Sequence, residues 1–156
     1  MISEWSRASM ALKPAQLREA RRFAVQLVYQ MEAGQQTFLS DPILQAFFGQ
    51  NEVGPDLRPI IQVAVQTVID KREEVDAQIE SCSSNWKLSR IARVDLAILR
   101  ICTAELMTRP EVAKDVIISE GVELGKQFGS TASGGFINGV LDGVARAMNV
   151  CAKSNP

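Results

Sequence analysis

Hydrophobic positions are most concentrated between Ile91 and Met107, where the chain reads IARVDLAILRICTAELM. Val94, Ile98 and Ile101 form one stripe at helical spacing, and leucines cover much of the remaining surface. A helix that is apolar almost all round is typical of a protein interior, with other elements packed on several sides. Four charged residues and a length of only seventeen residues exclude a membrane span. We therefore expect a buried central helix.

The same spacing of apolar residues predicts further helices over 14–33, 43–48, 57–81, 112–128 and 132–148. Pro14 suits a first helical turn and Gly34 a helix end, while Asp56 is expected to cap the long helix. Ser130 or Thr131 is expected to cap the last one. Alternating strand patterns are hard to find, so the predicted fold class is all-α.

The outer segments lack a steady period. Residues 1–13 are interpreted as a loose arm, 14–148 as a single helical domain and 149–156 as a tail. A short corner over 86–91, which includes Trp86, is expected just before the central helix, and the charge cluster over 70–76 is expected to face water.

Glycines recur every four residues in the last two predicted helices. Glycine inside a helix costs roughly 1 kcal/mol relative to alanine, so the run suggests close backbone approach. We expect tight packing of the final hairpin at Gly121, Gly125, Gly129, Gly135, Gly139 and Gly143.

The amino-acid composition limits the catalytic and metal-binding functions that the chain can have. The 156 residues are 46% hydrophobic and include no histidine, which removes the commonest metal ligand and general base. No nucleophile motif, phosphate loop or dinucleotide fingerprint appears, so we expect no catalytic residues, no metal and no cofactor. Cys82, Cys102 and Cys151 are far apart and odd in number, which favours a reduced cytoplasmic protein with Cys82 and Cys102 as small core residues.

Two carboxylates interrupt apolar helical segments, Asp95 and Glu120. Such a group needs a partner, either inside the molecule, such as Arg93 or Arg100, or on another molecule. The residues alone slightly favour internal pairing for both. A solvated helix face is the simpler interpretation of the remaining cluster, Glu73, Glu74 and Asp76.

Positive charge gathers at the N-terminal end. Residues 1–31 hold five basic and two acidic side chains, a net +3, while the rest hold twelve and sixteen, a net −4. Arg18, Arg21 and Arg22 are spaced to share a helix flank, with Tyr29 on a nearby face. This flank is either an ordinary solvated surface or a site where arginines contact phosphates and the ring stacks on an unpaired base.

The chain resembles the NusB family of bacterial transcription antitermination factors over about residues 14–148. Three blocks in the family's order carry the resemblance: ARRFAVQLVYQ (20–30), WKLSRIARVDLAILRI (86–101) and VIISEGVELGKQFG followed by FINGVLDGVA (116–145). The resemblance implies two perpendicular three-helix subdomains around the central helix and no enzymatic activity. It also implies binding of boxA-type RNA together with NusE, a small-subunit ribosomal protein, in the RNA polymerase complex that reads through terminators in ribosomal RNA operons.

Carried over by position, the resemblance assigns an acidic partner-binding position to Asp95, which favours an interface over an internal pair. The residues expected on the RNA side are Arg18, Arg21, Arg22, Tyr29 and Phe136. Of these, Arg18 and Arg21 match the family's basic motif, and Arg22 is an extra arginine in this chain.

Two departures from the family pattern weaken the expected RNA contact. Glu19 interrupts what is often a run of three arginines, and the segment 131–135 is uncharged where relatives carry charge. Because each neutralised phosphate adds to affinity, we expect modest RNA binding that depends on the partner protein.

Two other functions remain open. The chain could be a NusB-like interaction or oligomerisation module with little RNA binding of its own, and a homodimer could cover the basic flank. Ribosomal RNA cytosine methyltransferases also carry a NusB-like domain, but this sequence contains no cofactor-binding domain, so we expect no enzymatic activity. We also expect no membrane partner.

Overall fold

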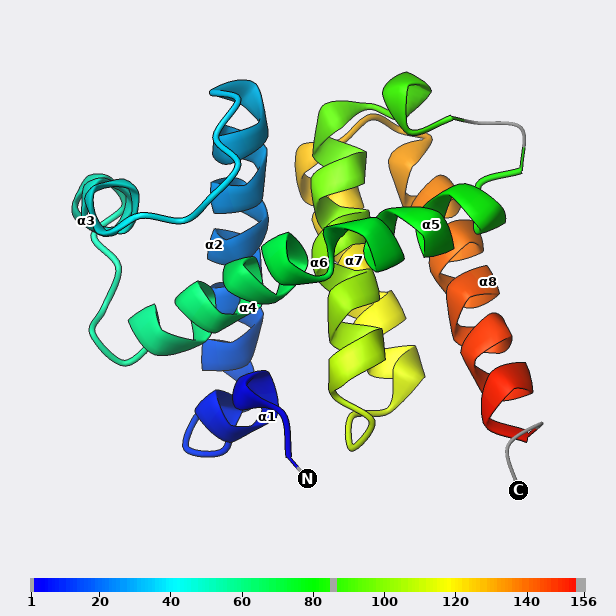
Figure 1. Cartoon of the computed structure of the whole chain (residues 1–156), viewed down its shortest axis with the longest axis horizontal. Coiled ribbons are helices and arrows are strands. Elements are labelled where there is room, and N and C mark those ends of the chain that lie inside the picture. The colour runs from blue at the N-terminus through cyan, green and yellow to red at the C-terminus, as the bar shows by residue number, and fades with distance from the viewer. Residues whose placement is uncertain (1, 85–86, 154–156) are drawn as a thin grey trace.

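The computed structural model describes residues 2–84 and 87–153 and is helical throughout, with no strand in these ranges (Figure 1). The predicted all-α class is confirmed. Within the described ranges, no helix has the combined length and apolarity needed to cross a membrane. The elements in chain order are α1 (Glu4–Ser9), α2 (Pro14–Ala33), α3 (Asp41–Gln50), α4 (Arg58–Asp70), α5 (Arg72–Cys82), the 3₁₀ turn η1 (Leu88–Arg90), α6 (Arg93–Thr108), α7 (Lys114–Phe128) and α8 (Ser133–Lys153).

Helix α6 is the buried central helix that the hydrophobic pattern predicts. Every residue from 95 to 106 is buried, and α6 contacts α1, α2, α4, α5, α7 and α8. In Figure 1, α4 and α5 run across α2, α6 and α8, so helices from both halves of the chain cover α6 on different sides.

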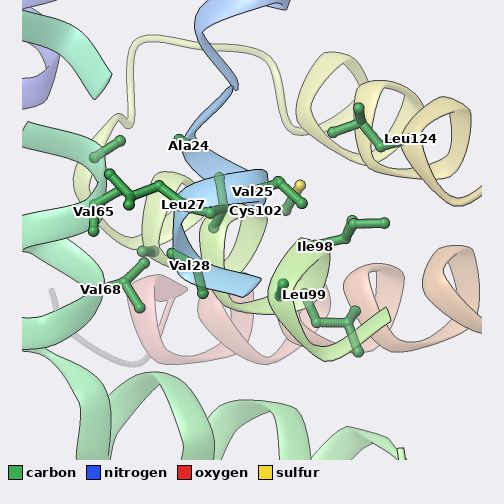
Figure 2. Packing of buried hydrophobic residues seen from close by; sticks show 14 of the residues in the cluster. Ala24, Val25, Leu27, Val28, Val65, Val68, Ile98, Leu99, Cys102 and Leu124 are labelled. Carbon is green, nitrogen blue, oxygen red and sulfur yellow. The ribbon is translucent and has the colours of Figure 1, made fainter. Parts of the chain in front are cut away.

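Helix α2 joins the first half of the chain to this centre. It begins at Pro14 and ends at Ala33, as predicted, with Gly34 as its C-terminal cap. Figure 2 shows its apolar side chains, including Leu27 and Val28, lying among side chains of α4 and α6. The burial of this face fixes the rotation of α2 and therefore decides which of its arginines face outward.

The long helix predicted over 57–81 is wrong in two respects. It is divided at Lys71 into α4 and α5, and Leu57 rather than Asp56 occupies the N-cap position, without a side-chain hydrogen bond. No glycine or proline marks the division. At the start of α5, Arg72 pairs with Glu32 of α2 at 3.1 Å and Asp76 pairs with Arg100 of α6 at 2.9 Å. The predicted corner is present as η1, and Trp86 lies outside the described residues.

The loose arm expected over residues 1–13 is also corrected. Residues Glu4–Ser9 form α1, which contacts α4 and α6 and buries Trp5 in the core. The Ser6 hydroxyl donates a hydrogen bond to Glu111 at 2.7 Å. Six residues are too few for a helical period to be visible in sequence. At the other end, α8 continues to Lys153 through most of the expected tail.

The final hairpin consists of α7 and α8. Helix α7 starts two residues later than predicted and is capped by Gly129, as expected. Neither Ser130 nor Thr131 caps α8; instead the Ser130 amide donates to the hydroxyl of Ser133, the first residue of α8, at 2.9 Å.

The expected tight packing of this hairpin applies to only some of the glycines. A Cβ atom on Gly125 would lie 2.6 Å from Ile137, and one on Gly121 would lie 3.0 Å from Cys102 and Leu141. Helix α7 therefore packs closely at both glycines, most tightly at Gly125. On α8, a Cβ atom on Gly135 or Gly139 would meet nothing within 4 Å, so the prediction is wrong at these two positions.

Candidate nucleic-acid interface

One face of α2 carries the outward-facing residues of the expected RNA flank. Arg18, Arg22 and Tyr29 are separated by four and seven residues, which places them on one line along the helix. Arg18 is the most open, with 67% of its side chain exposed, and Tyr29 is 38% exposed. The predicted flank is therefore present for Arg18 and Arg22, but Arg21 does not belong to it.

Arg21 is directed into the molecule instead. Its Nε and Nη2 atoms each lie 2.8 Å from a carboxylate oxygen of Glu105, a residue of α6 with no solvent exposure. Although burial opposes the charged form, the hydrogen bonds and the charge of Glu105 raise the pKa of Arg21 above its ordinary value. Arg109 also donates to Glu105, at 2.7 Å. The expectation that Arg21 faces RNA is therefore corrected, because its guanidinium is held by this buried pair.

The exposed arginines of α2 already have carboxylate partners. Arg18 pairs with Glu120 of α7 at 3.1 Å, and Arg22 pairs with Glu19 at 3.0 Å while lying over the ring of Phe23. Internal pairing of Glu120 is thus confirmed, with Arg18 as the partner rather than Arg93 or Arg100. Between α2 and α7 these side chains line an open groove of about 400 Å³. An incoming anion would compete with the resident carboxylates.

Asp95 lies in the first turn of α6, only 7% exposed, and its Oδ1 atom has no hydrogen-bond partner within the described chain. The internal pairing considered for it is wrong. Arg93 is exposed, and Arg100 is five residues away on a different side of the helix. A negative charge in the first turn gains from the helix dipole, but a buried carboxylate oxygen still lacks a donor.

Arg100 pairs with α5 instead. Its Nε atom donates to Asp76 at 2.9 Å, and its guanidinium approaches Glu32 of α2 at 3.5 Å. Asp76 also accepts from Arg72 at 3.0 Å. Asp76 is therefore a structural residue between α5 and α6, which corrects the solvated-face interpretation at this position, while Glu73 and Glu74 are exposed as expected.

A pocket of about 240 Å³ opens beside Asp95. Phe136 forms part of its wall from the start of α8, so the structure brings together two of the residues expected at the interface. Figure 1 shows the starts of α6 and α8 and the end of α2 at the same end of the molecule. The lining residues are Arg90, Ile91, Ala92, Asp95, Ala132, Ser133 and Phe136.

The described residues offer little reactive chemistry. They contain no group of three or more cysteine and acidic side chains placed to hold a metal ion. Burial raises the pKa of the Cys102 thiol to about 12, so this group stays protonated at neutral pH and is a poor nucleophile. The arrangement suits binding, with an arginine-bearing face, an exposed ring and a pocket that holds an unpartnered acceptor.

Comparisons with known proteins show the family to which the chain is similar. The model of the NusB family matches residues 18–146. The transcription antitermination protein NusB of Sorangium cellulosum (strain So ce56) is 40% identical over 125 residues, which are 80% of this chain and 88% of that protein. NusB of Myxococcus xanthus (strain DK1622) is 39% identical over 134 residues, 85% and 96% of the two chains.

The fold also matches solved structures. A crystal structure of the antitermination factors NusB and NusE in complex with double-stranded RNA aligns with a TM-score of 0.76, covering 86% of this chain and 99% of the matched one. The identity is 21%, so this similarity concerns the fold alone.

Proposed function

The chain belongs to the NusB family, and from this we propose that it is a transcription antitermination factor that binds boxA-type RNA of ribosomal RNA operons together with NusE. It acts by binding rather than as an enzyme. In this function it joins the RNA polymerase complex in the cytoplasm and helps the polymerase read through terminators.

One observation carries the proposal at the level of residues. Arg18, Arg22 and Tyr29 share the outward face of α2, and Phe136 and Asp95 line one pocket at the same end of the molecule as the end of α2. Arginines suit phosphates and exposed rings suit unpaired bases, so we assign RNA contact to the three residues of α2 and to Phe136.

We assign Asp95 to partner binding. Its unpartnered oxygen would gain a hydrogen bond from a donor on the partner protein. Arg21 keeps an indirect role: its buried pair with Glu105 fixes α2 on α6 and so sets the direction of the exposed face.

A second function is favoured by the carboxylates that pair with the arginines of α2. Glu120 and Glu19 already neutralise Arg18 and Arg22, which would suit a protein-interaction or oligomerisation module with little RNA binding of its own. A homodimer that covers this face would have the same effect.

Filter binding of a boxA-type single-stranded RNA at several salt concentrations, with and without NusE, separates the two functions. We expect weak binding by the chain alone and tight binding with NusE. Arg18→Ala should lower RNA affinity, while Arg146→Ala, which removes another exposed, ion-paired arginine from α8, should not. NusE binding without any RNA contribution from this chain would favour the interaction module.

A further inference from the structure

A second group of cations lies in the connection between α5 and α6. Lys87, Arg90 and Arg93 are all exposed, and none forms an ion pair with another described residue. This distinguishes them from Arg18 and Arg22, whose charges are already compensated. An uncompensated positive surface near the proposed interface therefore lies on this connection, which we name the 87–93 strip.

The strip borders two neighbouring pockets. Arg90 lines the pocket that holds Asp95, and Arg93 lines a second pocket of about 260 Å³ between α2 and α6. Ile91 lines both pockets, so the strip is adjacent to both of them. Figure 1 shows η1 at the end of the molecule where α6 and α8 start.

We propose that the 87–93 strip binds the phosphates of single-stranded RNA and extends the RNA path from α2 across the start of α6. This inference rests on the proposed function and adds a contact surface to it. Free guanidinium and ammonium groups can neutralise phosphates without displacing a resident carboxylate, which the arginines of α2 cannot do.

The neighbouring pocket favours RNA over an acidic protein segment. A nucleotide carries its negative charge on the outside, where the strip lies, and presents ring and amino groups to a pocket. Phe136 lines this pocket and offers an apolar ring on which a base can stack. An acidic peptide would bring carboxylates toward Asp95, and like charges at close range repel.

Removing the two arginines of the strip tests the inference. In Arg90→Ala/Arg93→Ala no ion pair is lost, so the melting temperature should not change. The matched control Arg7→Ala/Arg146→Ala removes the same charge from α1 and from α8. Both proteins are titrated with a boxA-type single-stranded RNA over a range of salt, and with NusE.

The strip variant should bind RNA roughly tenfold or more weakly than the control, with a salt slope about 1.4 smaller, from about 0.7 for each lost phosphate contact. NusE binding should be unchanged. Equal RNA affinity and equal salt slope in the two variants would contradict RNA binding by the 87–93 strip and leave the proposed function unaffected. Loss of NusE binding with RNA binding intact would assign the strip to the protein partner and overturn it as well. Absence of RNA binding in the unaltered protein, with and without NusE, would instead contradict the proposed function.

Discussion

Arg21 of α2 and Glu105 of α6 form a two-pronged ion pair inside the molecule, with both nitrogen to oxygen distances at 2.8 Å. The pair joins the helix that carries the proposed RNA face to the central helix. A loss of RNA binding on substitution of Arg21 therefore has to be distinguished from a loss of structure.

Arg21→Ala should lower the free energy of unfolding by about 3 kcal/mol, because it leaves the charge of Glu105 buried with Arg109 as its remaining partner. Arg18→Ala, which breaks an exposed pair, should change it by less than about 1 kcal/mol. Urea denaturation measures both. Similar stability in the two variants would show that the buried pair does not hold α2 in place.

Gly125 and Gly139 should respond oppositely to alanine. At Gly125 the added Cβ atom would lie 2.6 Å from the buried Ile137, so the substitution should destabilise by about 1 to 3 kcal/mol. At Gly139 the space is open, and alanine should stabilise by up to about 1 kcal/mol through its helix propensity. Thermal unfolding decides the sign, and a lower melting temperature for Gly139→Ala would contradict the expected open space.

Asp95→Ala should leave the isolated protein nearly as stable as before, because it removes a buried, unpartnered charge along with a first-turn acid worth about 0.3 to 1 kcal/mol. Binding of NusE should weaken roughly tenfold or more. Asp115→Ala is the matched control, since Asp115 is an exposed acid in the first turn of α7. Titration calorimetry with NusE measures the difference, and equal affinities for the two variants would remove Asp95 from the interface.

Attachment of α1 should depend on pH through Glu111. Burial tends to raise the pKa of this carboxyl, but the hydrogen bond from Ser6 and the charge of Arg109 lower it below the ordinary 4.5. A carboxyl whose pKa is depressed by folding contributes stability above its unfolded pKa and loses it as the pH falls through the folded value. We therefore expect α1 to loosen only below about pH 4.5.

The fluorescence of Trp5, measured in a Trp86→Phe background, reports this loosening. Glu111→Gln keeps an acceptor for Ser6 but cannot titrate, so its signal should not change over the same pH range. A transition of equal size in the Gln variant would assign the pH dependence to another group.

The sequence predicted those parts of the fold that depend on one helix alone. The burial of α6 follows from apolar residues on all its sides, and the bounds of α2 follow from Pro14 and Gly34. The break at Lys71 was not predictable, since neither glycine nor proline marks it and the residues that pair with the start of α5 are distant in sequence.

For the candidate site, spacing predicted the shared line of Arg18, Arg22 and Tyr29 but not the inward direction of Arg21. A signal did exist. Glu105 sits in a helix that is apolar on all sides, so it had to be buried and needed a cation. Which arginine supplied that cation depended on the rotation of α2, which only the packed structure defines.

The position of α6 also limits how the molecule can come apart. Because α6 touches helices from both ends of the chain, a cut in the connection between α5 and α6 would give two fragments, neither of which encloses a complete interior. The first would keep α2 and α4 without the surface that covers them, and the second would expose one side of α6. Neither fragment should fold alone, so α2 should not be exchangeable between proteins as an independent module.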